Sequence, residues 1–264
     1  MTHPDTGYQE ALRQAATLLL EADYVVGMTG AGISVESGIP PFRGPGGLWT
    51  KYGEPPMNGY ERFLADPQKA WQERLAPTGA SKEIQATIRQ AQPNPGHKAL
   101  VALEEMGLLR YLITQNVDNL HRRAGSRQLA EIHGNSTLVR CIQCTSRWPL
   151  EDISIERLPP SCTRCGSMLK IDTVSFGEPI PPDVLEVCHR ETQRCDCMLV
   201  AGTSATVYPA AWFPIQVQEK GGHLVEVNLY ESDLTPLCTV SLRGKSGEIL
   251  QQLVQAVQEL RAGK

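Results

Sequence analysis

Four cysteines in two closely spaced pairs are the residues whose spacing points most directly to a chemistry. Cys141 and Cys144 form the first pair and Cys162 and Cys165 the second, with seventeen residues between the pairs. Two residues between paired cysteines let a tight turn present both thiolates on one side, and two such turns complete a tetrahedral zinc site. Four thiolates leave no open coordination position, so we expect one structural zinc ion and not a catalytic one.

Two glycine-containing turns follow apolar, strand-like runs. Residues 30–34 (GAGIS) follow the first run, and residues 202–204 (GTS) follow a later one. Glycines at such points let backbone N–H groups approach phosphates at a helix N-terminus, and Ser34 adds a hydroxyl group. The same motif also serves as an ordinary tight turn. The next glycine, Gly38, lies too far along to complete G-x-G-x-x-G, which disfavours a standard dehydrogenase.

Polar side chains follow two further predicted strands. Gln115, Asn116 and Asp118 come after a strand that ends at residue 114, where they can hold a ribose and a carboxamide; Asp118 is alternatively a helix N-cap. His133 follows a short strand and suits a general base near neutral pH. The alternative is a structural histidine at a domain junction, with its hydrogen bonds satisfied and no catalytic role.

A loop rich in glycine and proline covers residues 38–56. Ordered loops of this length are often functional lids or binding loops. Phe42 and Arg43 on this loop could cover a bound cofactor. In the alternative interpretation the segment is a surface loop with Phe42 tucked into the core.

The elements that must position these residues alternate between strand and helix. Apolar patterning predicts strands at 24–29, 110–114, 129–132, 197–201 and 223–229. Helices are predicted at 8–22, 94–106, 118–123, 181–194, 209–220 and 247–262, with 58–91 helical in pieces. This alternation predicts an α/β fold with a mainly parallel sheet and helices on both faces. The cysteine module at 136–170 interrupts the order, so we expect it to be an insertion.

Composition sets broad limits on the class of protein. The chain has 264 residues, 41% hydrophobic and 20% charged, with a net charge of −4. This length allows one large domain, or a large domain with a small one. The negative net charge disfavours a protein that binds nucleic acid or a membrane surface, but it permits binding of a basic peptide. We find no signal peptide or membrane-spanning run, and expect a cytoplasmic protein with reduced cysteines.

The motifs together resemble the sirtuin family, the NAD-dependent protein deacylases. They keep the family order over nearly the whole chain, and the match is closest to small microbial members. The matching segments are GAGIS-x-x-SGIP-x-FRG at 30–44, TQNVDNLH at 114–121, EIHGN at 131–135, the cysteine pairs, FGE at 176–178, GTS at 202–204, VYPAA at 207–211 and VNL at 227–229.

The resemblance implies that NAD lies between two domains. The large, Rossmann-like domain would comprise residues 1–40, 95–135 and 172–264, and the small domain 41–94 and 136–171, the latter stretch being an inserted zinc ribbon. Residues implied to bind NAD are Gly30, Ala31, Gly32, Ser34, Phe42, Arg43, Gln115, Asn116, Asp118, His133, Gly202, Thr203, Ser204 and Asn228.

The resemblance also implies a reaction and a substrate. His133, with Asn116 and Asp118, would transfer the acyl group of an acyl-lysine protein to ADP-ribose, with release of nicotinamide. Val174, Phe176, Gly177, Glu178, Val207 and Tyr208 would hold the peptide as an added β-strand. Protein mono-ADP-ribosylation and NAD hydrolysis at the same site are the alternatives, as is a zinc-ribbon DNA binder. We expect a monomer that binds neither nucleic acid nor membranes.

Four positions depart from patterns found in the family. Pro41 replaces the usual Asp, which removes a carboxylate near the nicotinamide pocket. Ala205 often is Leu in the family, and we expect the smaller residue to widen the acyl-lysine channel. The Tyr-x-x-Arg pair of members that prefer acidic acyl groups is replaced by Arg74 and Pro77, so we do not predict desuccinylation. Arg74 alone could still meet an acidic acyl group.

Overall fold

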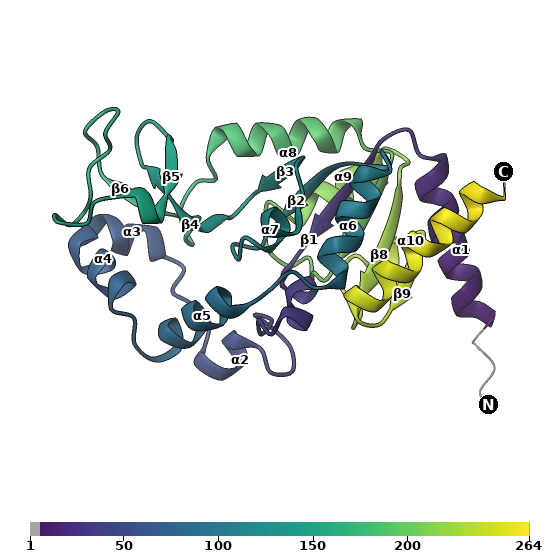
Figure 1. Ribbon diagram of the computed structural model, residues 1–264, viewed down its shortest axis with the longest axis horizontal. Coiled ribbons are helices and arrows are strands. Elements are labelled where there is room, and N and C mark those ends of the chain that lie inside the picture. The colour runs from purple at the N-terminus through teal and green to yellow at the C-terminus, as the bar shows by residue number, and fades with distance from the viewer. Residues whose placement is uncertain (1–5, 264) are drawn as a thin grey trace.

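The computed structural model describes residues 6–263 and contains two β-sheets of unequal size (Figure 1). The larger sheet has six strands in the order β3-β2-β1-β7-β8-β9, and all neighbouring strands are parallel. Its strands are β1 (Val25–Thr29), β2 (Leu109–Thr114), β3 (Leu129–Glu131), β7 (Cys197–Ala201), β8 (His223–Asn228) and β9 (Val240–Arg243). The predicted parallel α/β fold is therefore confirmed.

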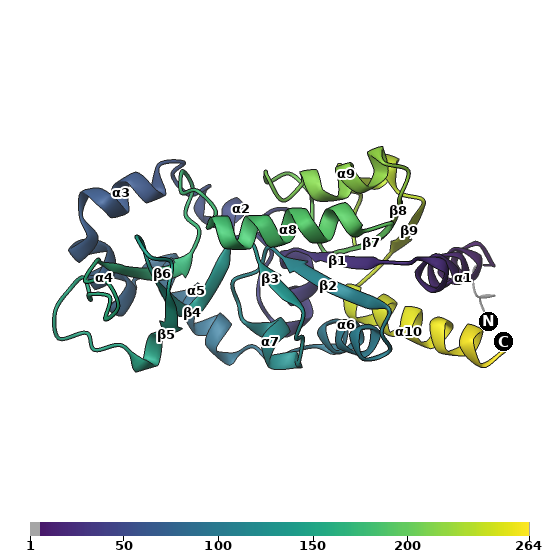
Figure 2. The same cartoon turned by 90° about the horizontal axis from the view of Figure 1, so that it is seen from above.

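Helices cover both faces of the large sheet (Figure 2). One face packs against α1 (Thr6–Glu21), α6 (Pro95–Glu105) and α10 (Ser246–Ala262). The other face packs against α8 (Pro182–Arg194) and α9 (Trp212–Glu219). Successive side chains of a strand point to opposite faces, so Val25 joins the first core and Val26 the second. All five residues of β1 and of β7 are buried, as expected for central parallel strands.

The smaller sheet lies beyond the carboxyl ends of the large one, at the left of Figure 1. It has three antiparallel strands in the order β5-β4-β6, namely β4 (Gly134–Cys141), β5 (Arg147–Pro149) and β6 (Leu169–Thr173). Trp71 and Phe63, from two helices, share its core with Val139 and Leu169. The Trp71 indole N–H donates to the Leu169 carbonyl at 2.9 Å. This sheet is the predicted inserted module.

The remaining helices lie outside the two cores of the large sheet. They are α2 (Leu48–Tyr52), α3 (Gly59–Ala65), α4 (Pro67–Leu75), α5 (Gly79–Gln90) and α7 (Leu120–Ala124), with 3-10 turns at Ala31–Ser37, Leu150–Asp152 and Thr235–Leu237. Within the described part of the chain, no helix has the length and apolar character needed to cross a membrane. The expectation about a signal peptide rests partly on residues 1–5, which lie outside the described residues.

Three local predictions differ from the structure. Strand β9 was not predicted, because its residues (VSLR) alternate between apolar and polar and do not form a continuous apolar run. The long loop at 38–56 contains α2, whose five residues are too few for a helical pattern. Helix α7 begins at Leu120 and not at residue 118, and Asp118 Oδ1 accepts the Leu120 N–H at 2.9 Å. The predicted domain boundaries stay a prediction.

Candidate active site

The candidate site lies where the strand order of the large sheet reverses. Strand β1 has β2 on one side and β7 on the other, and ligands of open α/β sheets bind beyond the carboxyl ends at such a point. A cavity of about 1120 Å³ opens there, between the two sheets. The segments that follow the carboxyl ends of β1, β2, β3, β7, β8 and β9 all contribute to its lining.

Glycines bring the turns after β1 and β7 into direct contact. The Gly32 N–H donates to the Gly202 carbonyl at 2.7 Å. Gly202 has φ +64°, and a Cβ there would lie 2.3 Å from the Ile33 nitrogen. A Cβ on Gly30 would lie 2.7 Å from the Thr203 Cβ. Any side chain at these glycines would push the two turns apart. Their backbones, which include Ala31, line the cavity.

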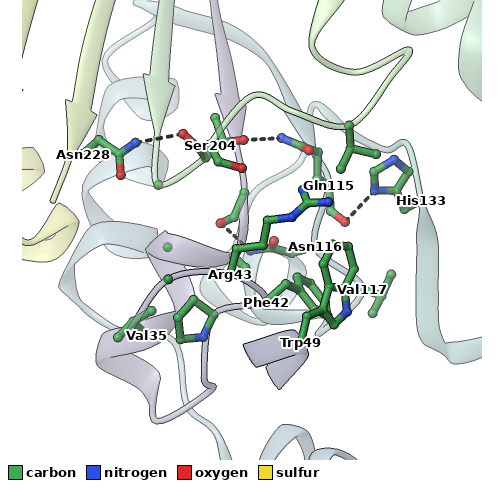
Figure 3. A pocket seen from close by; sticks show the side chains of 18 of the residues that line it. Val35, Phe42, Arg43, Trp49, Gln115, Asn116, Val117, His133, Ser204 and Asn228 are labelled. Carbon is green, nitrogen blue, oxygen red and sulfur yellow. Dashed lines mark hydrogen bonds between the residues drawn. The ribbon is translucent and has the colours of Figure 1, made fainter. Parts of the chain in front are cut away.

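His133 lines the cavity and is held through one ring nitrogen (Figure 3). Its Nδ1 lies 3.1 Å from the Gln115 carbonyl oxygen, and a carbonyl only accepts, so Nδ1 carries the proton. In the neutral ring Nε2 is then the basic nitrogen. Burial lowers the pKa of His133, against the effect of the hydrogen bond to Gln115. His133 is therefore neutral at pH 7 and able to accept a proton.

Asn116 lines the cavity, whereas Ser34 and Asp118 lie behind it. Asn116 Nδ2 donates to the Gly30 carbonyl at 3.0 Å and to Ser34 Oγ at 3.1 Å. Ser34 Oγ in turn donates to Asp118 Oδ2 at 2.6 Å. Ser34 and Asp118 are only 1% and 6% exposed. Of the three, only Asn116 is placed to touch a ligand, with its amide orientation fixed by the other two.

Burial also acts on the carboxyl group of this cluster. Burial raises the pKa of Asp118, and the hydrogen bonds from Ser34 and the Leu120 N–H oppose that rise. The Asn116 backbone N–H donates to Thr114 Oγ1 at 3.1 Å. Asn116 is thus fixed through both its backbone and its side chain.

A second set of hydrogen bonds fixes the turn after β7. Gln115 Nε2 donates to Thr203 Oγ1 at 2.9 Å, and Asn228 Nδ2 donates to the Thr203 carbonyl at 2.8 Å (Figure 3). Ser204 Oγ lies 3.1 Å from Thr206 Oγ1. All the predicted residues of this group line the cavity. The side chains of Gln115 and Asn228 therefore hold the 202–204 turn in place as well as facing the cavity.

The loop that begins at Pro41 reaches across the cavity mouth. The Phe42 ring packs on Trp49 of α2 with centroids 5.3 Å apart, and Trp49 lies 6.0 Å from the Phe176 ring. The Arg43 guanidinium lies 4.4 Å from the centroid of the Trp49 ring and donates to Thr206 Oγ1 at 2.5 Å. Phe42 is 41% exposed, so the alternative that it is tucked into the core is wrong.

The residues predicted to hold a peptide line the same cavity, next to the contacts of Trp49 and Arg43. Val174 donates its N–H to the His133 carbonyl at 2.8 Å, and Phe176 accepts the Tyr60 N–H at 3.0 Å. Residues from both predicted loops line the cavity, namely Val174, Phe176, Gly177, Glu178, Val207 and Tyr208. Glu178 contributes little of its carboxylate, because its side chain is 2% exposed.

The four paired cysteines form one cluster at the outer end of the small sheet. Their sulfur atoms all lie within 4.8 Å of one another. Cys141 Sγ lies 3.4 Å from Cys165 Sγ, and Cys144 Sγ lies 3.7 Å from Cys162 Sγ. Zinc–sulfur bonds of about 2.3 Å in a tetrahedron place the sulfurs about 3.8 Å apart. The cluster therefore fits one four-coordinate zinc ion, and the other four cysteines lie elsewhere in the fold.

The residues that depart from the family pattern occupy different surroundings. Pro41 lines the cavity. Ala205 does not, being 4% exposed in the core of the large sheet, so the expectation that it widens the channel is wrong. Arg74 also lies outside the lining and donates to the Ser136 carbonyl at 2.9 Å. Its guanidinium is engaged in structure and is not placed to meet an acidic acyl group.

Several lining residues were not predicted from the sequence. Trp49 was missed because α2 was taken as part of a loop. Lys245 and Ser246 follow β9, and their place in the site was missed with that strand. The rule that ligands lie at carboxyl ends would have found them had β9 been recognised. Val117 and Ile180 also line the cavity. Val117 lies between the predicted residues Asn116 and Asp118 in the TQNVDNLH segment, whereas nothing in the sequence context of Ile180 marks it.

Fold and site together define a nucleotide-binding α/β enzyme with an inserted metal ribbon. A model described as Sir2 family matches residues 30–209 of the chain. The chain therefore belongs to the Sir2 family, the sirtuins.

Curated relatives match over almost their full length. A protein named NAD-dependent protein deacylase from Thermococcus kodakarensis is 45% identical, over 95% of this chain and 97% of its own. NAD-dependent protein deacylase 1 from Archaeoglobus fulgidus is 44% identical, over 91% and 96%. The match thus covers nearly the whole of these relatives.

Solved structures of Sir2 proteins resemble this chain in both fold and sequence. A Sir2 homologue bound to NAD superposes with a TM-score of 0.77 at 42% identity, covering 98% of this chain and 96% of that one. A Sir2 complex with a p53 peptide and NAD superposes with a TM-score of 0.76 at 34% identity, covering 96% and 99%.

Proposed function

We infer that this chain is an NAD-dependent protein-lysine deacylase. It transfers the acyl group of an acyl-lysine side chain to ADP-ribose and releases nicotinamide and lysine. The observation that carries this inference is His133, neutral at pH 7 and protonated on Nδ1, on the wall of a cavity formed at the strand-order reversal. Relatives named as NAD-dependent protein deacylases support it.

Different residues of the cavity would bind different parts of NAD. The N–H groups of Gly30, Gly32 and Gly202 donate to carbonyls within the protein. The turns after β1 and β7 would therefore meet the phosphates through the N–H groups of Ala31, Thr203 and Ser204, which line the cavity. Asn116 presents an amide in a fixed orientation, supported by Ser34 and Asp118. Phe42 and Arg43 close the mouth of the cavity from the Trp49 side. NAD supplies a ribose carbon that accepts the acyl oxygen as nicotinamide leaves.

His133 is the general base of the transfer. Its Nε2 takes the proton from a ribose hydroxyl group, which raises the nucleophilicity of that oxygen toward the acyl carbon. General bases of this kind contribute about 10²- to 10⁴-fold to a rate. The Gln115 carbonyl stabilises the ring as it becomes positively charged, because Nδ1–H keeps its acceptor.

The acyl-lysine peptide binds as a short strand between two loops. Residues 174–178 offer one backbone edge and residues 207–208 the other, and both line the cavity. Main-chain hydrogen bonds of this kind give affinity without a strict sequence requirement. The zinc ribbon stabilises the sheet that carries the first loop, and its four thiolates leave no coordination position for substrate.

Mass spectrometry of the products formed from NAD and acyl-lysine peptides tests this function. The panel is acetyl, butyryl, myristoyl and succinyl. We expect acyl-ADP-ribose from at least one uncharged acyl peptide and little from succinyl, because Arg74 is bound to Ser136. NAD consumption without acyl-ADP-ribose would overturn the inference in favour of ADP-ribosyl transfer, seen as label on protein, or of NAD hydrolysis.

We also propose that the protein acts in the cytoplasm as a monomer, without binding nucleic acid. Four thiolates that hold zinc must stay reduced, which favours a reducing compartment. The net charge of −4 disfavours contact with phosphate backbones. Light scattering at low protein concentration tests the oligomeric state, and a stable dimer would contradict the proposal.

A further inference from the structure

A row of three cations crosses one face of the small sheet. Arg140 on β4 is the direct cross-strand partner of Arg147 on β5 and of Lys170 on β6. Like charges directly opposite on neighbouring strands repel each other. Arg140 and Lys170 are only 6% and 5% exposed, so water screens them little. This cation row therefore requires carboxylates close by.

Two of the carboxylates belong to the ends of regular elements. Asp172, two residues beyond Lys170 on β6, accepts from Arg140 Nε at 2.7 Å and from Arg147 Nε at 2.8 Å. Asp183, in the first turn of α8, accepts from Arg147 Nη1 at 2.9 Å. Arg147 is thus neutralised without any contact to the lining of the cavity.

The third carboxylate, Glu178, belongs to the loop predicted to bind the peptide. Its Oε1 accepts from Arg140 Nη2 at 2.6 Å, and its Oε2 lies 2.9 Å from Lys170 Nζ. The same Oε2 also accepts the Ser175 N–H at 2.9 Å. Glu178 N–H donates to the Ser175 carbonyl at 2.9 Å, and Gly177 has φ +79°. Residues 175–178 therefore form a tight turn, here the peptide turn, that the Glu178 carboxylate closes.

Lys170 holds the segment before this turn as well. Its Nζ donates to the Thr173 carbonyl and, at 3.3 Å, to the Ile171 carbonyl. The next residue, Val174, donates to the His133 carbonyl. One ammonium group thus fixes both the end of β6 and the carboxylate that closes the peptide turn.

We propose that the cation row is a clamp that sets the conformation of the peptide turn through Glu178, so that Arg140 and Lys170 are positioning residues for the acyl-lysine peptide. Neither residue lines the cavity. The inference rests on the proposed function, because it assigns the peptide to this turn. The ion pairs and hydrogen bonds of the cation row among the described residues do not reach the glycine turns after β1 and β7. We therefore expect the clamp to act on peptide binding and not on NAD binding.

The test compares Lys170→Met with Arg147→Gln in the full chain. Both variants remove one charge from the cation row, but only Lys170 contacts Glu178. Hydrogen bonds between charged groups are stronger than those between neutral groups, so we expect Lys170→Met to raise the peptide KM about tenfold or more. The KM for NAD should stay unchanged. Arg147→Gln should lower the melting temperature while both KM values stay at the wild-type level.

Two further measurements separate the possible outcomes. Hydrogen exchange of the Ser175 amide should accelerate in Lys170→Met and not in Arg147→Gln, and this readout needs no catalysis. Arg140→Lys keeps the charge but cannot span Asp172 and Glu178 together. We expect it to raise the peptide KM with zinc retained, and it replaces Lys170→Met if that variant does not fold.

The clamp would be overturned if Lys170→Met and Arg140→Lys had the wild-type peptide KM and the wild-type rate of Ser175 amide exchange. A wild-type protein that forms no acyl-ADP-ribose from any peptide would overturn the proposed function instead. In that case the Ser175 exchange rates still decide whether the clamp holds the turn.

Discussion

At the scale of single residues, the chemistry of the site depends on how burial shifts the pKa of each ionisable side chain. His133 and Asp118 are both ionisable and both lie in the site, but burial lowers the pKa of the first and raises that of the second. Both shifts favour the uncharged form. For Asp118 the hydrogen bonds from Ser34 and Leu120 restrain the shift. His133 has only the Gln115 carbonyl, and stays available as a base.

Replacing His133 by Ala tests its role as base. We expect deacylation to fall by about 10²- to 10⁴-fold, the usual contribution of a positioned general base. NAD affinity should change little, because the glycine turns and Asn116 are untouched. Turnover is measured as acyl-ADP-ribose and NAD affinity by calorimetry. His223→Ala, which changes an exposed histidine at the start of β8, is the control. Substantial turnover in His133→Ala would remove it from the role of base.

The pH dependence of deacylation follows from the same residue. Only neutral His133 accepts a proton, so the rate is lost as the pH falls through the His133 pKa and is level above it. Because burial lowers this pKa, the acid limb should have its midpoint below about 6.5, the ordinary histidine value. The measurement is the rate at saturating substrates from pH 4.5 to 9. A midpoint at or above the ordinary value contradicts the assignment.

At the scale of elements, the two glycine turns show why the site needs both β1 and β7. Each turn leaves room for the other because Gly30 and Gly32 in the first turn and Gly202 in the second have no Cβ at the contact. Asn228, at the end of β8, and Gln115, after β2, then hold the 202–204 turn from two sides. The site is therefore a product of neighbouring strands and not of one motif.

Gly202→Ala tests this dependence. Its Cβ would lie 2.3 Å from the Ile33 nitrogen at φ +64°, so the turns must separate. We expect NAD affinity to fall about tenfold or more, which corresponds to about 1.4 kcal/mol. Gly221→Ala is the matched control, since it also has positive φ (+86°) but meets nothing within 4 Å. That variant should lose about 1 kcal/mol of stability and keep its NAD affinity. Equal NAD affinities in both variants would contradict the argument.

At the scale of the whole molecule, the two sheets have separate cores and occupy different ends of the molecule (Figure 2). Residues of both sheets and of the segments that follow them line the cavity. The small sheet pairs β4 with β5 and β6, and none of these strands joins the large sheet. Phe63 on α3 and Trp71 on α4 complete the core of the small sheet. The cysteine cluster lies within this unit. Loss of the metal should therefore affect one part of the molecule first.

The variant Cys162→Ala tests whether the metal stabilises the small sheet. Three thiolates hold zinc less well than four, and binding of a structural metal contributes directly to folding. We expect loss of bound zinc and unfolding of the small sheet, while the six-stranded sheet keeps its secondary structure. Zinc content and circular dichroism measure the two effects. Cys188→Ala, at a buried cysteine outside the cluster, should keep its zinc. Full zinc content in Cys162→Ala would refute the four-cysteine site.

Much of the site could be predicted because its signals are local. Strands such as 25–29 and 197–201 are continuous apolar runs, and glycine or polar residues directly after them mark the carboxyl ends. The cysteine spacing fixes a metal site with no knowledge of the fold. Strand β9 (VSLR) and helix α2 (LWTKY) mix apolar with polar residues over a few positions, so neither shows the continuous apolar run that marks β1 and β7.

The sequence by itself determined the α/β fold, the Sir2 motifs, His133 and the four cysteines, because each depends on residues close together in the chain. Only the tertiary structure decided that Ser34 and Asp118 lie behind Asn116, that Arg74 binds the Ser136 carbonyl, and that the Glu178 carboxylate turns into the cation row. Burial and charge pairing depend on neighbours far apart in sequence. Sequence patterns therefore identify a side chain's chemistry, but packing decides which groups it meets.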